Sequence, residues 1–165
     1  MTMLLKGSCR CGAVHFSVES HTPVPYQLCY CSICRKQQGG GGYAINLGAD
    51  AETLQIDGEE HLGLFQATIQ DDERPVCEIS SGERRFCREC GSALWLYDPT
   101  WPDLVHPFAS AIDTELPIAP DRVHLMLKYK ASWVEPEIRP GDKAFDLYPA
   151  ESIADWHKRM GLWVD

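Results

Sequence analysis

Apolar and polar residues alternate along much of this chain, and such a two-residue period is typical of strands that are buried on one face. The period is clearest over residues 13–19 and 123–129. Less regular stretches predict further strands, which we place at residues 26–31, 43–47, 53–57, 62–69, 75–80, 92–98 and 104–112. The pattern therefore predicts a mainly β protein.

Proline and glycine mark places where these strands are interrupted. Pro107 has no backbone N–H to donate, so it would confine a strand over residues 104–112 to a sheet edge or a bulge. Residues 35–38 could form about one helical turn, which the four glycines at 39–42 would end. Residues 70–75 are polar or charged up to a closing proline, and they predict a solvated loop.

One short helix is expected near the end of the chain. Ser152 and Asp155 resemble the residue pair that caps the start of a helix. Apolar residues follow at helical spacing, up to a glycine that would stop the helix, and these are Ile153, Trp156, Met160 and Gly161.

Length and composition indicate a single domain. A chain of 165 residues that is 44% hydrophobic can bury a core of ordinary size, so we expect one domain over residues 1–165. No apolar run is long enough to cross a bilayer, and residues 1–6 are too short for a signal peptide. We therefore expect a soluble, cytoplasmic protein. The net charge of -9 argues against nucleic acid or an anionic membrane as a partner, because both attract a positive surface.

The eight cysteines carry the chemistry that the sequence suggests. In a reducing compartment, clustered cysteines at C-x-C and C-x-x-C spacings point to metal rather than to disulfides. A secreted domain held by disulfides is the alternative, and the expected absence of a signal peptide weighs against it.

Three of these cysteines form a dense cluster, Cys29, Cys31 and Cys34. A one-residue gap on a strand and a two-residue gap through a tight turn would let three sulfurs converge on one tetrahedral ion. Catalytic zinc characteristically has three protein ligands and an open fourth position, so this cluster is the candidate catalytic site.

Two cysteine pairs stand apart from this cluster, and they are Cys9 with Cys11 and Cys87 with Cys90. Together they would supply the four thiolates of a closed structural zinc site, which would clamp the start of the sheet to its middle. Other pairings of these seven thiols remain open from the sequence. We expect two zinc ions per chain.

The eighth cysteine, Cys77, lies alone in the expected strand at 75–80. Free cysteine is among the most buried residue types, so we expect a small core side chain there. As a fourth ligand of the cluster it would instead close the second site and favour a binding module. Among the histidines, His124 and His61 could reach a site as general base, although a surface or hydrogen-bonded histidine is the ordinary reading.

Basic residues and glycines surround the proposed ligands. Seven of the 15 lysines and arginines lie within three residues of one, and these are Lys6, Arg10, Arg35, Lys36, Arg84, Arg85 and Arg88. They would offset the negative charge of zinc-thiolate groups, and some could attract a small anionic substrate. The glycines at 39–42 are not followed by the lysine of a phosphate-binding loop, which argues against a nucleotide site. They could form a flexible connector, or they could let backbone amides approach a bound ligand.

Four stretches taken in order resemble one known family, and they are G-S-C-R-C-G-A-V, C-Y-C-S-I-C-R-K, F-C-R-E-C-G-S-A-L and H-L-M-L-K-Y-K-A-S-W. The chain resembles the glutathione-dependent formaldehyde-activating family, which includes the centromere protein V group. The resemblance covers about residues 6–135 and leaves a C-terminal extension at 136–165.

The resemblance implies a β-tent fold of antiparallel sheets that two zinc ions hold together. Cys9, Cys11, Cys87 and Cys90 match the family's structural site, and Cys29, Cys31 and Cys34 match its catalytic one. It further implies a carbon-sulfur lyase that acts on a glutathione-type thiol adduct, as in S-hydroxymethylglutathione formation from formaldehyde. The alternative is a zinc-stabilised binding module without turnover. The sequence identifies neither the substrate nor the general base, and it leaves the oligomeric state open.

Overall fold

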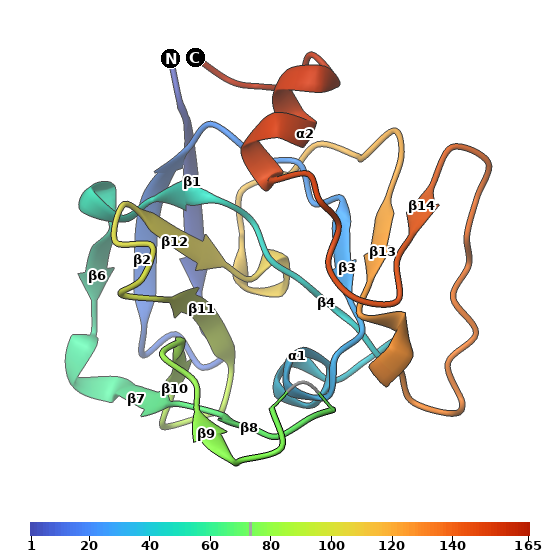
Figure 1. Ribbon diagram of the computed structural model, residues 1–165. Coiled ribbons are helices and arrows are strands. Elements are labelled where there is room, and N and C mark those ends of the chain that lie inside the picture. The colour runs from blue at the N-terminus through green and yellow to red at the C-terminus, as the bar shows by residue number, and fades with distance from the viewer. Residues whose placement is uncertain (73) are drawn as a thin grey trace.

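The structure is a computed structural model that describes residues 1–72 and 74–165. It is built mainly of antiparallel sheets with two short helices, which confirms the predicted fold class (Figure 1). Both termini lie close together, near helix α2. Across the described residues, no helix combines the length and the apolar character needed to traverse a bilayer.

Two antiparallel sheets form one side of the molecule, which we call its first half. The smaller contains, in spatial order, β1 (Met3–Ser8), β2 (His15–Ser20) and β6 (Gln55–Asp57). The larger contains β5 (Ala49–Asp50), β12 (Leu104–Pro107), β11 (Ala93–Tyr97), β10 (Glu83–Cys87) and β7 (Leu62–Phe65).

A third sheet, a hairpin and the helices complete the fold. The third sheet contains β14 (Lys143–Ala144), β13 (Val123–Leu125), β3 (Gln27–Cys29) and β4 (Ala44–Ile45). The hairpin pairs β8 (Thr68–Ile69) with β9 (Glu78–Ile79). The α-helices are α1 (Ser32–Gln38) and α2 (Ile153–Arg159), and single 3-10 turns occur at Ala51–Thr53, Glu59–His61, Ala109–Ala111 and Leu127–Tyr129.

Each half of the molecule has its own core. In the first, alternating apolar residues of β1 and β2 meet those of the five-stranded sheet, and Phe16 packs edge-on against Trp95 at 5.0 Å between ring centroids. In the second, Trp156 of α2 stacks on Tyr26 at 3.7 Å. The expected C-terminal helix is confirmed, and the Ser152 side chain caps it by accepting a hydrogen bond from the Asp155 amide.

Several expected strands are shorter than the pattern suggested. The strand expected at 123–129 ends at Leu125, because Met126 takes a left-handed backbone conformation with φ of 60°. The strand expected at 104–112 ends at Pro107, and a 3-10 turn follows. The expectation that Pro107 marks an edge or bulge was wrong. Strand β12 is interior, and it tolerates the proline because β5 pairs only with its first two residues.

Two elements next to the clustered cysteines differ from expectation. Strand β1 has no alternation in the sequence, yet it pairs with β2 along its whole length. Helix α1 begins at Ser32 rather than near residue 35, so the two-residue gap before Cys34 is the first turn of a helix. Of the solvated loop expected at 70–75, Glu73 lies outside the described residues, and the neighbouring Asp72 pairs with Lys128 at 2.7 Å.

The segment after β13 is held to the sheet by one buried carboxylate. The Asp142 side chain has no exposed surface, and it accepts hydrogen bonds from the backbone amides of Arg122 and Arg139 at 2.8 and 3.0 Å. The His124 Nε2 atom lies 3.2 Å from Oδ2 of the same carboxylate. Burial alone would raise the pKa of Asp142, but these hydrogen bonds hold that pKa well below its usual range.

Replacing Asp142 with asparagine should lower the free energy of unfolding by about 3 kcal/mol at neutral pH, because it breaks a buried ionic network. Since the folded-state pKa lies below the unfolded value of about 3.9, the charge stabilises the native state above that pH and stops doing so as the pH falls below it. Chemical denaturation at pH 7 measures the loss. The exposed Asp146 is the matched control, and equal midpoints for Asp142→Asn and Asp146→Asn would contradict this role.

Candidate metal centres

Four cysteines from distant parts of the chain meet at one end of the first core. Cys9 and Cys11 lie in the β1–β2 loop, Cys87 ends β10, and Cys90 lies in the turn that follows. Their sulfur atoms all lie within 4.8 Å of one another. Sulfurs on a tetrahedral zinc ion with bonds of 2.3 Å are about 3.8 Å apart. The measured separations, 3.6 Å for Cys9 to Cys11 and 3.8 Å for Cys11 to Cys87, fit such an ion.

Backbone and side-chain donors surround this four-cysteine cluster. The Val14 amide donates to the Cys9 sulfur at 3.2 Å, and the Ser92 hydroxyl lies 3.1 Å from the Cys90 sulfur. Hydrogen bonds from Ser92 lower the pKa of Cys90 to about 5. Gly91, with φ of 78°, allows the tight turn between Cys90 and Ser92. At Cys11 a backbone hydrogen bond to Ala13 is outweighed by loss of hydration and by the neighbouring thiols, which raise the pKa to about 12, and burial raises the pKa of Cys87. All four groups can therefore ionise together only when a cation replaces their protons.

The other three cysteines form a separate cluster in the second core. Cys29 ends β3, Cys31 caps α1, and Cys34 lies in the first turn of that helix. Their sulfur atoms also lie within 4.8 Å of one another, so the three could hold one ion together. Cys29 and Cys34 are buried, and Cys31 is partly exposed.

Contacts within the three-cysteine cluster shift the pKa values of its thiols in opposite directions. The Cys34 amide donates to the Cys31 sulfur at 3.3 Å. Hydrogen bonds from Cys29, and then from Cys34, lower the pKa of Cys31, whereas the contacts with Cys31 and Cys34 together with burial raise the pKa of Cys29. Three such groups can all ionise only when a cation replaces their protons, which is the behaviour of a metal site.

Arg84 is one of the seven basic residues expected near the proposed ligands, and the structure shows which cluster it reaches. It precedes Cys87 by three residues, yet its guanidinium lies 3.7 Å from the sulfur of Cys34 in the other cluster. Neighbouring residues of a strand point to opposite faces, and this carries Arg84 of β10 across to the other cluster. The side chain is 9% exposed, and its Nη1 has no hydrogen-bond partner among the described residues. No signal in the sequence distinguished it from the other six basic residues.

Tyr148 is a second residue that the sequence did not indicate. Loss of hydration, followed by the negative charge of the three cysteines, raises the pKa of its hydroxyl. The residue as a whole is exposed, and its hydroxyl lies within electrostatic range of the cluster.

Cys77 joins neither cluster. It is exposed beside the β8–β9 hairpin, so the expectation of a buried core side chain was wrong. A two-stranded hairpin has no second layer to cover both of its faces, which leaves this thiol in solvent. Cys77 is also outside the group of sulfurs within 4.8 Å, so the three-cysteine cluster gains no fourth cysteine among residues 1–72 and 74–165.

The histidines considered as general bases are engaged elsewhere. His124 is fully buried, with Nδ1 2.8 Å from the Tyr30 hydroxyl and Nε2 3.2 Å from Asp142. Tyr30 stands between Cys29 and Cys31 in sequence, so this chain of hydrogen bonds ties β3 to β13 behind the cluster. His61 pairs with Glu89 at 3.1 Å beside the four-cysteine cluster. Both are hydrogen-bonded histidines, as the ordinary reading expected.

The glycines at 39–42 allow backbone conformations and close contacts that other residues would not. Gly39 caps the end of α1, and Gly42, with φ of 88°, lies so close to Val134 that a Cβ atom there would be 2.4 Å from that side chain. The run therefore ends the helix and lets the chain pass a neighbouring segment.

Comparisons with known proteins identify the family to which this chain is similar. Residues 4–128 match the model of the family described as "Glutathione-dependent formaldehyde-activating enzyme". A protein of Halomonas elongata named "Putative glutathione-dependent formaldehyde-activating enzyme" is 59% identical over 160 residues, which are 97% of this chain and 98% of that protein. A crystal structure of a Rhodobacter sphaeroides protein is 27% identical and covers 69% of this chain and 99% of its own, with a TM-score of 0.47. The extent of the family match and the identity to the Halomonas relative lead to one conclusion: this chain belongs to the glutathione-dependent formaldehyde-activating enzyme family.

Proposed function

We propose that this protein is a zinc-dependent carbon-sulfur lyase that joins glutathione and formaldehyde into S-hydroxymethylglutathione, or separates them again. The observation that carries the proposal is the set of three converging sulfurs beside the buried Arg84 guanidinium, whose Nη1 has no hydrogen-bond partner among residues 1–72 and 74–165. Membership of the family supports the choice of glutathione and formaldehyde. The net charge of -9 favours a small molecule over nucleic acid as the partner.

The residues divide into a structural and a reactive group. Cys9, Cys11, Cys87 and Cys90 would hold one zinc with four protein ligands, which leaves no position for a substrate. Cys29, Cys31 and Cys34 would hold a second zinc with three. When bound there, zinc supplies a Lewis acid that keeps a thiol ionised near neutral pH.

Arg84 would act on the substrate side of this site. Its buried charge offsets the net negative charge of three thiolates around a divalent ion. Its free Nη1 can donate to an anionic group of the incoming thiol, such as a carboxylate. The residue would thereby orient glutathione, with its sulfur toward Cys29, Cys31 and Cys34.

The reaction needs no other reactant. A bond forms between the glutathione sulfur and the carbonyl carbon of formaldehyde, and the carbonyl π electrons move to its oxygen. The thiol proton ends on that oxygen, so thiol and aldehyde combine without oxidation or reduction. The reverse reaction returns both molecules.

The test combines metal content with turnover. We expect two zinc ions per chain by elemental analysis of freshly purified protein. Exchange NMR with ¹³C-formaldehyde and glutathione should show faster interconversion of free aldehyde and adduct than the uncatalysed mixture shows. Cysteine and 2-mercaptoethanol in place of glutathione measure the thiol specificity. Normal metal content without acceleration would refute the lyase and leave a zinc-stabilised binding module.

Replacing Arg84 with glutamine should lower kcat/KM by roughly tenfold to a hundredfold, because one charge-assisted hydrogen bond to the substrate is worth about 1.5–3 kcal/mol. The kcat/KM of Arg84→Lys should lie between that of the parent protein and that of Arg84→Gln, since lysine keeps the charge but loses the planar guanidinium. Both variants should retain two zinc ions.

The matched control is Arg85→Gln, because Arg85 is the next residue on the same strand and faces the other way. Its kcat/KM should equal that of the parent protein. An equal loss in Arg84→Gln and Arg85→Gln would mean that general charge, rather than Arg84 itself, guides the substrate.

A further inference from the structure

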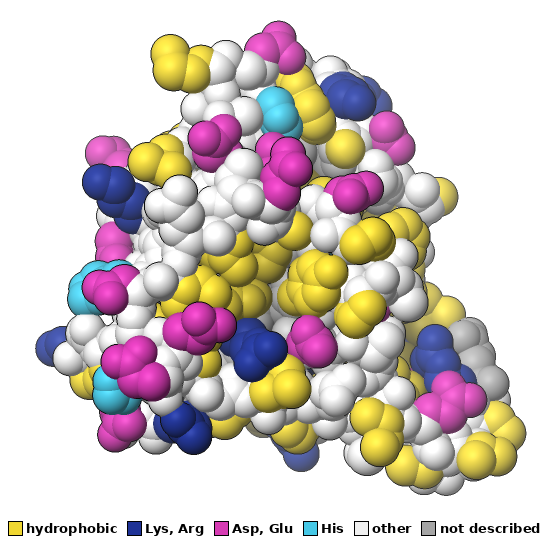
Figure 2. Space-filling model, turned by 90° about the vertical axis from the view of Figure 1, so that its left-hand side faces the viewer, with side chains coloured by type: hydrophobic (Ala, Val, Ile, Leu, Met, Phe, Trp, Pro, Cys, Tyr) yellow, Lys and Arg dark blue, Asp and Glu magenta, His cyan; other side chains and the backbone are white. Residues whose placement is uncertain are grey.

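A cavity of about 510 Å³ opens on the face of the five-stranded sheet that is turned away from the three-cysteine cluster. The two faces are defined by consecutive residues of β10, since Arg84 reaches Cys34 on one side and Arg85 lines the cavity on the other. Figure 2 shows this side of the molecule, with a hollow lined by hydrophobic side chains and charged side chains around its edge. No cysteine lines the cavity, so it is a separate site.

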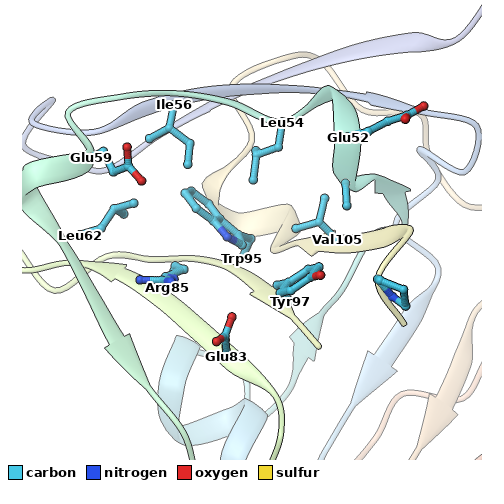
Figure 3. A pocket seen from close by; sticks show the side chains of 12 residues that line it. Glu52, Leu54, Ile56, Glu59, Leu62, Glu83, Arg85, Trp95, Tyr97 and Val105 are labelled. Atoms are coloured by element: carbon cyan, nitrogen blue, oxygen red, sulfur yellow. The ribbon is translucent and has the colours of Figure 1, made fainter. Parts of the chain in front are cut away.

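The floor of the cavity is apolar and firmly packed. Trp95 of β11 and Val105 of β12 form its centre and are 3% and 0% exposed. The edge-on contact between Phe16 and Trp95 holds the indole from behind. Figure 3 shows Leu54 and Ile56 pointing toward Trp95 from the opposite wall. A preformed concave site with such a floor suits a small ligand that has an apolar group.

Three charged side chains surround this floor without partners of their own. Glu83 and Arg85 stand two residues apart on the same face of β10, and Glu59 comes from the 3-10 turn across the cavity (Figure 3). Within the described part of the chain, none of the three makes a side-chain hydrogen bond or an ion pair. Glu52 also lies at the edge, but Figure 3 shows its carboxylate directed away from Trp95.

Because the cavity edge carries both negative and positive side chains, it favours a ligand that also carries both charges. A simple organic cation would be attracted by Glu59 and Glu83 but repelled by Arg85, and a simple anion would meet the opposite problem. A zwitterion can satisfy both signs at once, with its carboxylate on the guanidinium and its ammonium on a glutamate. Residues two apart on a strand are about 7 Å apart, a gap that an ammonium and a carboxylate on one carbon can bridge.

We propose that this cavity binds an apolar α-amino acid, with Arg85 on its carboxylate, Glu83 or Glu59 on its ammonium, and its side chain on the floor at Trp95. The site is independent of the proposed lyase reaction, because it lies on the other face of the sheet and uses none of the groups assigned to that reaction.

The test titrates the metal-loaded, full-length protein with L-phenylalanine and follows the indole N–H signal of Trp95 by NMR. The chain has five tryptophans, so a Trp95→Phe variant assigns that signal. We expect saturable shifts of this signal with a Kd of about 1 mM or tighter. Three relatives of the ligand each lack one group. Phenethylamine lacks the carboxylate, 3-phenylpropionate lacks the ammonium, and glycine lacks the apolar side chain, and each should bind on the order of tenfold more weakly.

Matched variants locate the binding. Glu83→Gln removes the charge of a partly exposed side chain at constant size, and Arg85→Gln removes the charge and shortens a partly exposed side chain. Each should weaken phenylalanine binding by roughly tenfold. Glu52→Gln removes a charge that points away from the cavity, so its affinity should equal that of the parent. Cys31→Ser should also bind phenylalanine normally, which separates this result from any failure of the lyase proposal.

Three outcomes would overturn the proposal. The Trp95 signal could stay in place up to about 10 mM phenylalanine. One of the singly charged relatives could bind as tightly as phenylalanine, which would make the site specific for a cation or an anion. Binding could also be the same in Arg85→Gln, Glu83→Gln and Glu52→Gln, which would place the ligand elsewhere.

Discussion

Replacing Cys87 with serine should lower the stability of the whole fold, by roughly 5 kcal/mol and by roughly 10–20 °C in Tm. Cys87 is fully buried, and its sulfur lies 3.8 Å from that of Cys11, in the cluster that links the β1–β2 loop to the end of β10. Zinc in a structural site contributes folding free energy directly, so a lost ligand weakens both metal binding and the link between the two sheets. Thermal unfolding, followed by circular dichroism, measures the change.

Cys77→Ser is the control for this experiment, because Cys77 is exposed and belongs to neither cluster. Its Tm and metal content should equal those of the parent. A strong chelator should destabilise the parent protein by an amount similar to Cys87→Ser. If Cys87→Ser and Cys77→Ser unfold at the same temperature with equal metal content, the four cysteines carry no structural metal.

Replacing Cys31 with serine should abolish most of the proposed turnover while the fold remains. We expect the metal content to fall from two ions to one, and the rate to fall by at least about a hundredfold, because the metal contributes several kcal/mol to the chemical step. Serine is a preferred residue at the start of a helix, so α1 should keep its cap on Cys34. The loss should therefore concern the metal and not the helix.

Exchange NMR and elemental analysis on the same sample measure the two effects together. Circular dichroism should show an unchanged fold and a Tm within a few degrees of the parent. The Cys77→Ser control should retain two ions and the parental rate. A Cys31→Ser protein that keeps two ions and full activity would remove the three-cysteine cluster from the reaction.

The sequence predicted the parts of the fold in which one local signal dominates. Alternation located β2 at His15–Ser20, because one face of that strand lies in the core. The capping pattern located α2, because Ser152 binds the amide of Asp155 within the same turn. Cysteine spacing likewise indicated Cys29, Cys31 and Cys34 as one group and two short pairs elsewhere, since each C-x-C or C-x-x-C unit is short enough to share an ion. The structure then brings the two pairs together.

Features that depend on tertiary neighbours could not be predicted in this way. The start of α1 was missed because its cap is Cys31, a residue type that rarely serves as one. The position of Arg84 depends on which cluster lies across the sheet from β10, and alternation does not identify the partner of a strand face. Cys77 is exposed because it precedes a strand of the β8–β9 hairpin, whose residues belong to none of the buried hydrophobic clusters, and composition does not reveal this.

The parallel pairing of β3 with β13 has a consequence for the time at which a metal ion could bind to the three-cysteine cluster. Tyr30 and His124, which join these strands beside the three cysteines, are 94 residues apart in sequence. On a growing chain, Cys29, Cys31 and Cys34 emerge long before the strand that supports them. Contacts between such distant segments form slowly, since a large loop must close first. Metal binding at the three-cysteine cluster would then have to wait until β13 has been made, whereas the four-cysteine cluster, complete at Cys90, could bind its ion earlier.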